Sequence, residues 1–177
     1  MYMNQFIFNP SSIKNNEKEF SRALNLTLNG ELPVIICVGT DLVVGDCLGP
    51  YIGTKLNEKL QGKSFIYGTL NSPITALEIE TIKKTIKIIH PNSKILVIDA
   101  AVGKKDEIGF IKLIDSGIKP GLGINKDLPS IGDVSIIGIV SDYNNKTASN
   151  QPITRFSLVY RIANQIINGI TNYILKK

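Results

Sequence analysis

The sequence of 177 residues has little of what several common kinds of protein require. Its two cysteines, Cys37 and Cys47, are too few for a disulfide framework and fit a reducing compartment. No stretch reaches the roughly 18 apolar residues that a membrane-spanning helix needs. The first ten residues lack the basic start and apolar core of a signal peptide. We therefore expect a cytoplasmic protein with no membrane partner.

The excess of positive over negative charge is also small. The net charge is +5, and it comes mostly from lysines that are scattered along the chain. These lysines form no cluster with arginines or interleaved aromatic side chains, which a nucleic-acid groove would require. Solvated surface faces explain them better, so we expect no nucleic-acid partner.

The composition, 43% hydrophobic and 20% charged, predicts one globular domain over residues 1–177, with no internal repeat. Apolar patterns of helical and strand type alternate along it. They predict helices at 16–28, 49–60, from 75 to 89 and 154–174, and strands at 34–38, 64–70, 94–100, 108–114 and 134–140. Such alternation is typical of a mostly parallel sheet with helices on both faces.

The stretch GTDLVVGDCLGP, residues 39–50, follows the first buried strand and is rich in acids and glycines. Asp99 ends another apolar strand, KILVIDA. Because the carboxyl ends of parallel strands share one edge of a sheet, both acidic positions should lie in the ligand crevice there. The segment from Asp115 to Asp133 also leaves a strand, and its length favours a functional loop.

These motifs resemble a known group of proteins. Asp46 before Leu-Gly-Pro, the Ile-Asp-Ala at Asp99 and the later GIKPGLG are similar to the bacterial spore germination protease. With YGTLNSP and LPSIGD added, the match over about residues 33–141 is closer to the YyaC-type sporulation proteins, and more distantly to the hydrogenase maturation peptidases. The resemblance implies an α/β, three-layer α/β/α fold of the phosphorylase/hydrolase type, a peptidase ancestry, and Asp46 and Asp99 as the site. It also implies a sporulating cell or spore interior as the location.

Two carboxylates at one site have a clear chemical use. When they lie close together, they share a proton, so one can act as a base on water while the other donates a proton to the leaving amine. Gly45, Gly49 and Gly103 would let a substrate backbone approach this pair. The alternative is structural: Asp46 would cap the helix that follows it, and Asp99 would cap a turn.

The single histidine argues against two other kinds of site. Cys47 would need a base, but the strand before Asp99, at about 3.3 Å per residue, holds His90 roughly 20 Å or more from the crevice. The hydrogenase maturation peptidases hold nickel with a histidine beside two acids, and no histidine stands at the matching place here. We expect His90 to end a helix, and we expect neither a metal nor a cofactor; a hard cation held by Asp46 and Asp99 is the less favoured alternative.

The remaining candidates are weaker. Glycines around Pro120, namely Gly117, Gly121 and Gly123, would bring the long loop close to an extended peptide, and Lys126 could orient a peptide carbonyl or be simply solvated. Turns and caps explain the other acids: Asp41, Glu78, Asp115 and Asp133. We expect a sporulation-associated, peptidase-like protein that acts on a protein or peptide. A non-enzymatic protein that binds a peptide or partner in the same crevice is the alternative.

Overall fold

The computed structural model describes residues 5–9, 16–119, 130–144 and 153–177. Within these ranges the chain forms four α-helices, six strands and one short 3-10 helix. The helices are α1 (Asn16–Thr27), α2 (Leu48–Leu60), α3 (Ile79–Ile89) and α4 (Phe156–Ile174), with η1 at Lys105–Glu107. The strands are β1 (Gln5–Phe8), β2 (Val34–Cys37), β3 (Ile66–Tyr67), β4 (Ile95–Gly103), β5 (Ile111–Ile114) and β6 (Val134–Asp142).

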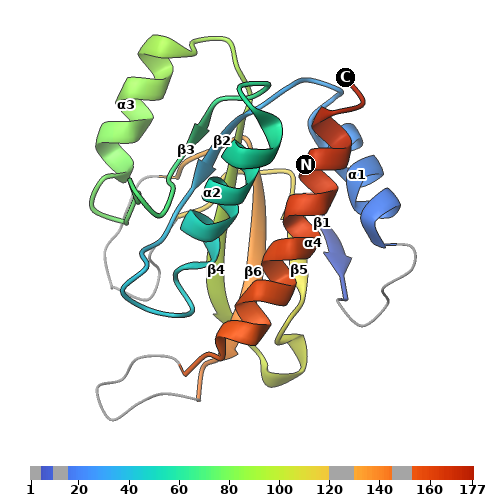
Figure 1. Ribbon diagram of the computed structural model, residues 1–177, viewed down its shortest axis with the longest axis vertical. Coiled ribbons are helices and arrows are strands. Elements are labelled where there is room, and N and C mark those ends of the chain that lie inside the picture. The colour runs from blue at the N-terminus through green and yellow to red at the C-terminus, as the bar shows by residue number, and fades with distance from the viewer. Residues whose placement is uncertain (1–4, 10–15, 120–129, 145–152) are drawn as a thin grey trace.

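The strands form one sheet in the order β1-β5-β6-β4-β2-β3 (Figure 1). The four strands from β6 to β3 are parallel to one another. The strand β5 is antiparallel to β6, and β1 is antiparallel to β5. The sheet is therefore mixed but mostly parallel, as the alternation of strands and helices predicted.

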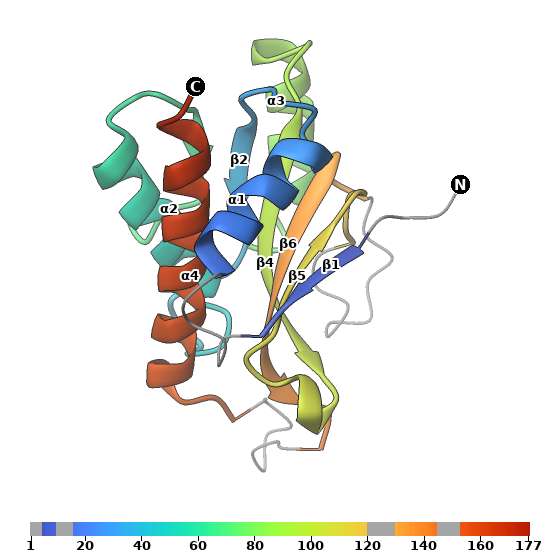
Figure 2. The same cartoon turned by 90° about the vertical axis from the view of Figure 1, so that its right-hand side faces the viewer.

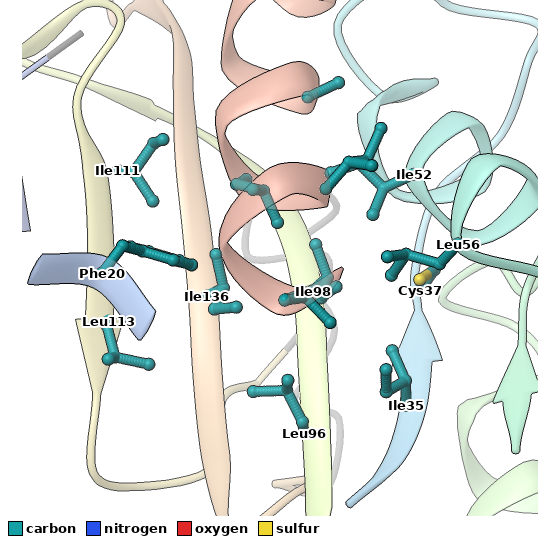
Figure 3. Packing of buried hydrophobic residues seen from close by; sticks show 14 of the residues in the cluster. Phe20, Ile35, Cys37, Ile52, Leu56, Leu96, Ile98, Ile111, Leu113 and Ile136 are labelled. Atoms are coloured by element: carbon teal, nitrogen blue, oxygen red, sulfur yellow. The ribbon is translucent and has the colours of Figure 1, made fainter. Parts of the chain in front are cut away.

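Helices cover both faces of this sheet, which confirms the three-layer prediction. The helices α1, α2 and α4 lie on one face (Figure 2), where they share a core with alternate strand residues such as Ile35, Ile98 and Ile136 (Figure 3). The other strand residues face α3, whose Ile79 and Ile86 pack with Val97 in a second core. Two buried faces explain why β2 and β4 are apolar throughout rather than alternating.

The predicted apolar stripe of α4 is buried, with one exception. Five of its six residues are fully buried: Val159, Ile162, Ala163, Ile166 and Ile170. Phe156, in the first turn, is 51% exposed and instead contacts the rings of Tyr51 and Tyr160, with centroids 6.1 Å and 6.4 Å away. The first turn of α4 therefore extends beyond the core.

Several elements differ from the prediction, among them α3, β3 and β1. The helix α3 begins at Ile79 rather than at residue 75, because Glu78 accepts the Thr75 N–H at 2.8 Å in a turn that precedes the helix. The strand β3 has only two residues. The strand β1 was not predicted, since four residues with no flanking pattern give no period to detect.

Candidate functional site

The sheet changes its direction of winding between β2 and β4. From β2 the chain passes through α2 to β3 on one side, and then returns through α3 to β4 on the other side of β2. The two helices consequently cover opposite faces. Ligand crevices of α/β sheets lie beyond the carboxyl ends of strands at such a reversal. Asp46 follows β2 and Asp99 lies in β4, so both acids belong to this point of the fold.

Asp99 lies where β4 loses one of its two neighbours. The ladder between β2 and β4 ends with Cys37 opposite Ile98, whereas β4 continues beside β6 as far as Gly103. The prediction that Asp99 ends its strand is therefore wrong: Asp99 is inside β4, at the first position past the end of β2. Side chains alternate along a strand, so Asp99 shares the α3 face with Val97.

Asp46 belongs to the turns that join β2 to α2. Its carbonyl oxygen accepts the Thr40 N–H at 3.2 Å, which closes the loop on itself. The first position before α2 is Cys47, and no side chain caps the helix there. Within the part of the chain that the structure describes, the Asp46 carboxylate accepts no hydrogen bond, so the capping alternative has no support.

The two carboxylates interact electrostatically. The pKa of Asp99 is raised to about 7: burial is the main cause, the Ala100 N–H, donated to Asp99 Oδ1 at 2.8 Å, opposes the shift, and the negative charge of Asp46 adds a smaller increase. Burial also raises the pKa of Asp46, although this residue is exposed by its surface area and Asp99 is half-buried. A carboxyl group with a pKa near 7 can both accept and donate a proton at neutral pH.

Cys47 and Asp41 lie in the same loop as Asp46. Burial raises the pKa of the Cys47 thiol, and the charges of Asp46 and Asp41 add to this effect. The thiol donates to the carbonyl oxygen of Val44 at 3.0 Å. These factors outweigh the hydrogen bond from the backbone of Cys47, which lowers the pKa, and they favour the neutral thiol rather than the nucleophilic thiolate. The side-chain turn expected of Asp41 is made by Thr40, whose hydroxyl accepts the Leu42 N–H at 3.3 Å.

Two glycines hold the loop against the end of β2. Gly39 has φ +142°, and a Cβ there would lie 2.0 Å from the Asp46 carbonyl oxygen. A Cβ on Gly49 would lie 2.0 Å from the carbonyl oxygen of Val38. The sequence predicts that Gly49 admits a substrate backbone; in the structure it admits the backbone of Val38, directly after β2. Gly39 was not singled out, although its place directly after an apolar strand was a signal.

Two further predicted glycines have protein neighbours. A Cβ on Gly45 would lie 3.1 Å from the Thr154 hydroxyl, and one on Gly103 would lie 2.8 Å from a methyl group of Ile139. Gly103 is also four residues beyond Asp99 along β4, about 13 Å at the rise of an extended strand. Gly45 therefore stays beside the site, whereas Gly103 packs at the far end of the strand.

The long segment between β5 and β6 begins and ends at the opposite edge of the sheet, because β5 runs antiparallel to β6. Asp133 caps the start of β4 by accepting the Ile95 N–H at 2.8 Å. Gly117 lies beside it, where a Cβ would be 2.4 Å from the Gly132 carbonyl oxygen. The predicted site residues Gly121, Gly123 and Lys126 lie outside the described residues, so their role remains a prediction.

His90 is at the end of α3, as expected. Its N–H bonds to the Ile86 carbonyl oxygen, and its ring lies 2.9 Å from the Tyr67 hydroxyl and stacks near Phe65. It does not join the two carboxylates. Among the residues that the structure describes, no three metal-ligating side chains form a group that could hold an ion. The donor set of a nickel-binding histidine with two acids is thus not present in the described part of the site.

The fold is similar to that of a solved peptidase. The crystal structure of the NiFe hydrogenase maturation protease HycI from Thermococcus kodakarensis KOD1 matches 88% of this chain and 99% of its own, with a TM-score of 0.58 and 15% identity. At this identity the similarity concerns the fold alone.

No helix in the described part of the chain combines the length and apolar character needed to span a membrane.

Sequence similarity identifies the relatives of the chain. It is 34% identical over 142 residues to a Bacillus subtilis (strain 168) protein described as "Uncharacterized protein YyaC", and the alignment covers 80% of this chain and 69% of the relative. The model of the family described as "Protein of unknown function (DUF1256)" matches residues 9–169. Since that match spans most of this chain, the chain belongs to the DUF1256 family.

Proposed function

We propose that the protein is a sporulation-associated peptidase that hydrolyses a peptide bond with Asp46 and Asp99. The observation that carries this proposal is the position of two acids with raised pKa values at the winding reversal: burial is the main cause at both, the pKa of Asp99 reaches about 7, and the charge of Asp46 adds a smaller part there. The fold shared with HycI and the relation to YyaC support it. The site would then operate in the cytoplasm of a sporulating cell or in the spore interior.

In the proposed reaction, Asp46, the more exposed carboxylate, removes a proton from a water molecule that attacks the carbonyl carbon. Protonated Asp99 donates its proton to the leaving nitrogen as the carbon–nitrogen bond breaks. The products are a carboxylic acid and an amine, and a proton passed from Asp46 to Asp99 through solvent restores the starting state. Partial enclosure of Asp99 holds its proton until a substrate accepts it.

The experiment is incubation of the purified protein with spore-type small acid-soluble proteins, followed by mass spectrometry of the products. Defined fragments should appear with the wild type and be lost with Asp99→Asn and with Asp46→Asn. Asp115→Asn is a matched control, because Asp115 is exposed and lies at the opposite edge of the sheet. Fragments that persist in both site variants would refute the two-aspartate mechanism.

One observation favours the binding alternative. Leu42 and Val44, in the loop that carries Asp46, are 89% and 44% exposed. Exposed apolar side chains beside a crevice suit contact with a partner, with or without cleavage. If the protein retains an intact small acid-soluble protein on a column, and Leu42→Asp releases it while no fragment forms, the crevice is a binding site without catalysis.

A further inference from the structure

Among the described residues, the outer edge of β1 is a free strand edge. β1 pairs with β5 on one side, and no strand in the described ranges pairs with it on the other. Its sequence, QFIF, contains no lysine, proline or other charge that would discourage a second strand. The opposite edge of the sheet ends in β3, which is protected by having only two residues. The two edges therefore differ in their capacity to pair with another chain.

A groove runs along this open edge, between β1 and α1, which lie on the side that faces the viewer in Figure 2. Its volume is about 500 Å³. Exposed apolar side chains lie on both sides of this edge: Leu26 of α1 is 65% exposed, and Ile7 of β1, which by strand alternation faces away from the α1 side on which Phe8 packs, is 55% exposed. Glu19 and Arg22, of opposite charge, line the same groove. The lining thus combines an apolar strip with one acid and one base.

We propose that this edge is a dimer interface, occupied by β1 of a second copy of the chain. An isologous interface must be complementary to itself. A strand edge meets this condition, because two copies of β1 related by a two-fold axis run antiparallel and exchange backbone hydrogen bonds. An axis perpendicular to the sheet also keeps both α1 helices on the same face, where they would meet across the axis.

The charges in the groove favour a second copy of the chain over an unrelated strand as the occupant. With Glu19 and Arg22 on the same helix, a two-fold axis can place the acid of each copy near the base of the other, which gives two reciprocal ion pairs. A partner of one charge sign would be attracted by one of these side chains and repelled by the other. Leu26 on the α1 face and Ile7 on the other face supply apolar surface that is removed from water. The sheet would then continue across both copies.

The experiment measures the mass of the intact protein by light scattering and by sedimentation velocity, up to about 100 μM. We expect a concentration-dependent dimer. Ile7→Asp should weaken it at least about tenfold, since two carboxylates would approach across the axis. Ile89→Asp is the matched control: Ile89 is 56% exposed but lies on α3, so this variant should dimerise as the wild type does.

A charge exchange makes the test independent of the folding of β1. Glu19→Arg or Arg22→Glu alone should weaken the dimer, and the two changes together should restore it. Circular dichroism confirms that each variant is folded before its mass is compared. A wild type that stays monomeric at every concentration would overturn the proposal. A dimer that is insensitive to Ile7→Asp and to both single charge changes would overturn it equally, since it would use another surface.

Discussion

Replacing Asp99 by asparagine should stabilise the protein at high pH, and the size of the effect follows from its surroundings. The pKa of Asp99 is raised from 3.8 to about 7, with burial as the main cause. In the folded state the proton is therefore held more tightly than in the unfolded chain. The stabilisation by the protonated carboxyl is complete below about pH 4 and is lost as the pH rises through about 7. At about 1.4 kcal/mol per pKa unit, the ionised carboxylate costs up to about 4 kcal/mol.

Asparagine removes this penalty while its side-chain oxygen can still accept the Ala100 N–H that Asp99 accepts at 2.8 Å. Between pH 5 and pH 8 the free energy of unfolding of Asp99→Asn should increase, relative to the wild type, by about 2 kcal/mol once partial solvent screening is allowed for. Urea denaturation followed by circular dichroism at both pH values measures this change, with Asp115→Asn as the control. A difference between Asp99→Asn and the wild type that does not vary with pH would refute the reasoning.

Two further predictions concern the loop between β2 and α2. Gly49→Ala should lower the free energy of unfolding by about 2–4 kcal/mol, because its Cβ would lie 2.0 Å from the Val38 carbonyl oxygen. Gly45→Ala, whose nearest neighbour is a hydroxyl at 3.1 Å, should cost clearly less, and equal urea midpoints for the two variants would contradict this account. Asp46→Asn should move the pH profile of Cys47 alkylation to lower pH, because burial and then the charge of Asp46 raise the pKa of that thiol. Mass spectrometry of iodoacetamide-treated protein reads this out, and an unmoved profile would show that Asp46 does not act on Cys47.

The sequence was sufficient for the elements with strong patterns. The helical stripe ending in Ile170 and the apolar strand around Ile98 are long enough for their periods to be detected, and their alternation gave the layered fold. It was not sufficient for β1, because a four-residue strand is defined by its partner β5 rather than by its own pattern. The direction of β5 was equally hidden, so the edge of the sheet at which Gly117 lies could not be predicted.

For the candidate site, the sequence brought Asp46 and Asp99 to one edge because parallel strands share their carboxyl ends. It could not show that β4 continues beyond Asp99, since this depends on how far β6 extends beside it. The glycines were the main difficulty. A glycine that lets the chain approach itself, such as Gly49, and one that lets a substrate approach have the same sequence signature. Only the neighbouring atoms distinguish the two roles.

The pairing of the first elements with the last also has a consequence for how the chain folds. Phe6 pairs with Leu113, the Asn168 amide donates to Glu17, and the Tyr173 hydroxyl donates to the Glu31 carbonyl oxygen. Closing contacts over such long stretches of chain carries a large entropic cost and slows folding. During synthesis, the apolar faces of β1 and α1 are covered only after β5 and α4 have been made, because β5 and α4 supply the contacts. The residues of β1 and α1 are thus made before β5 and α4 but are protected from water only after them.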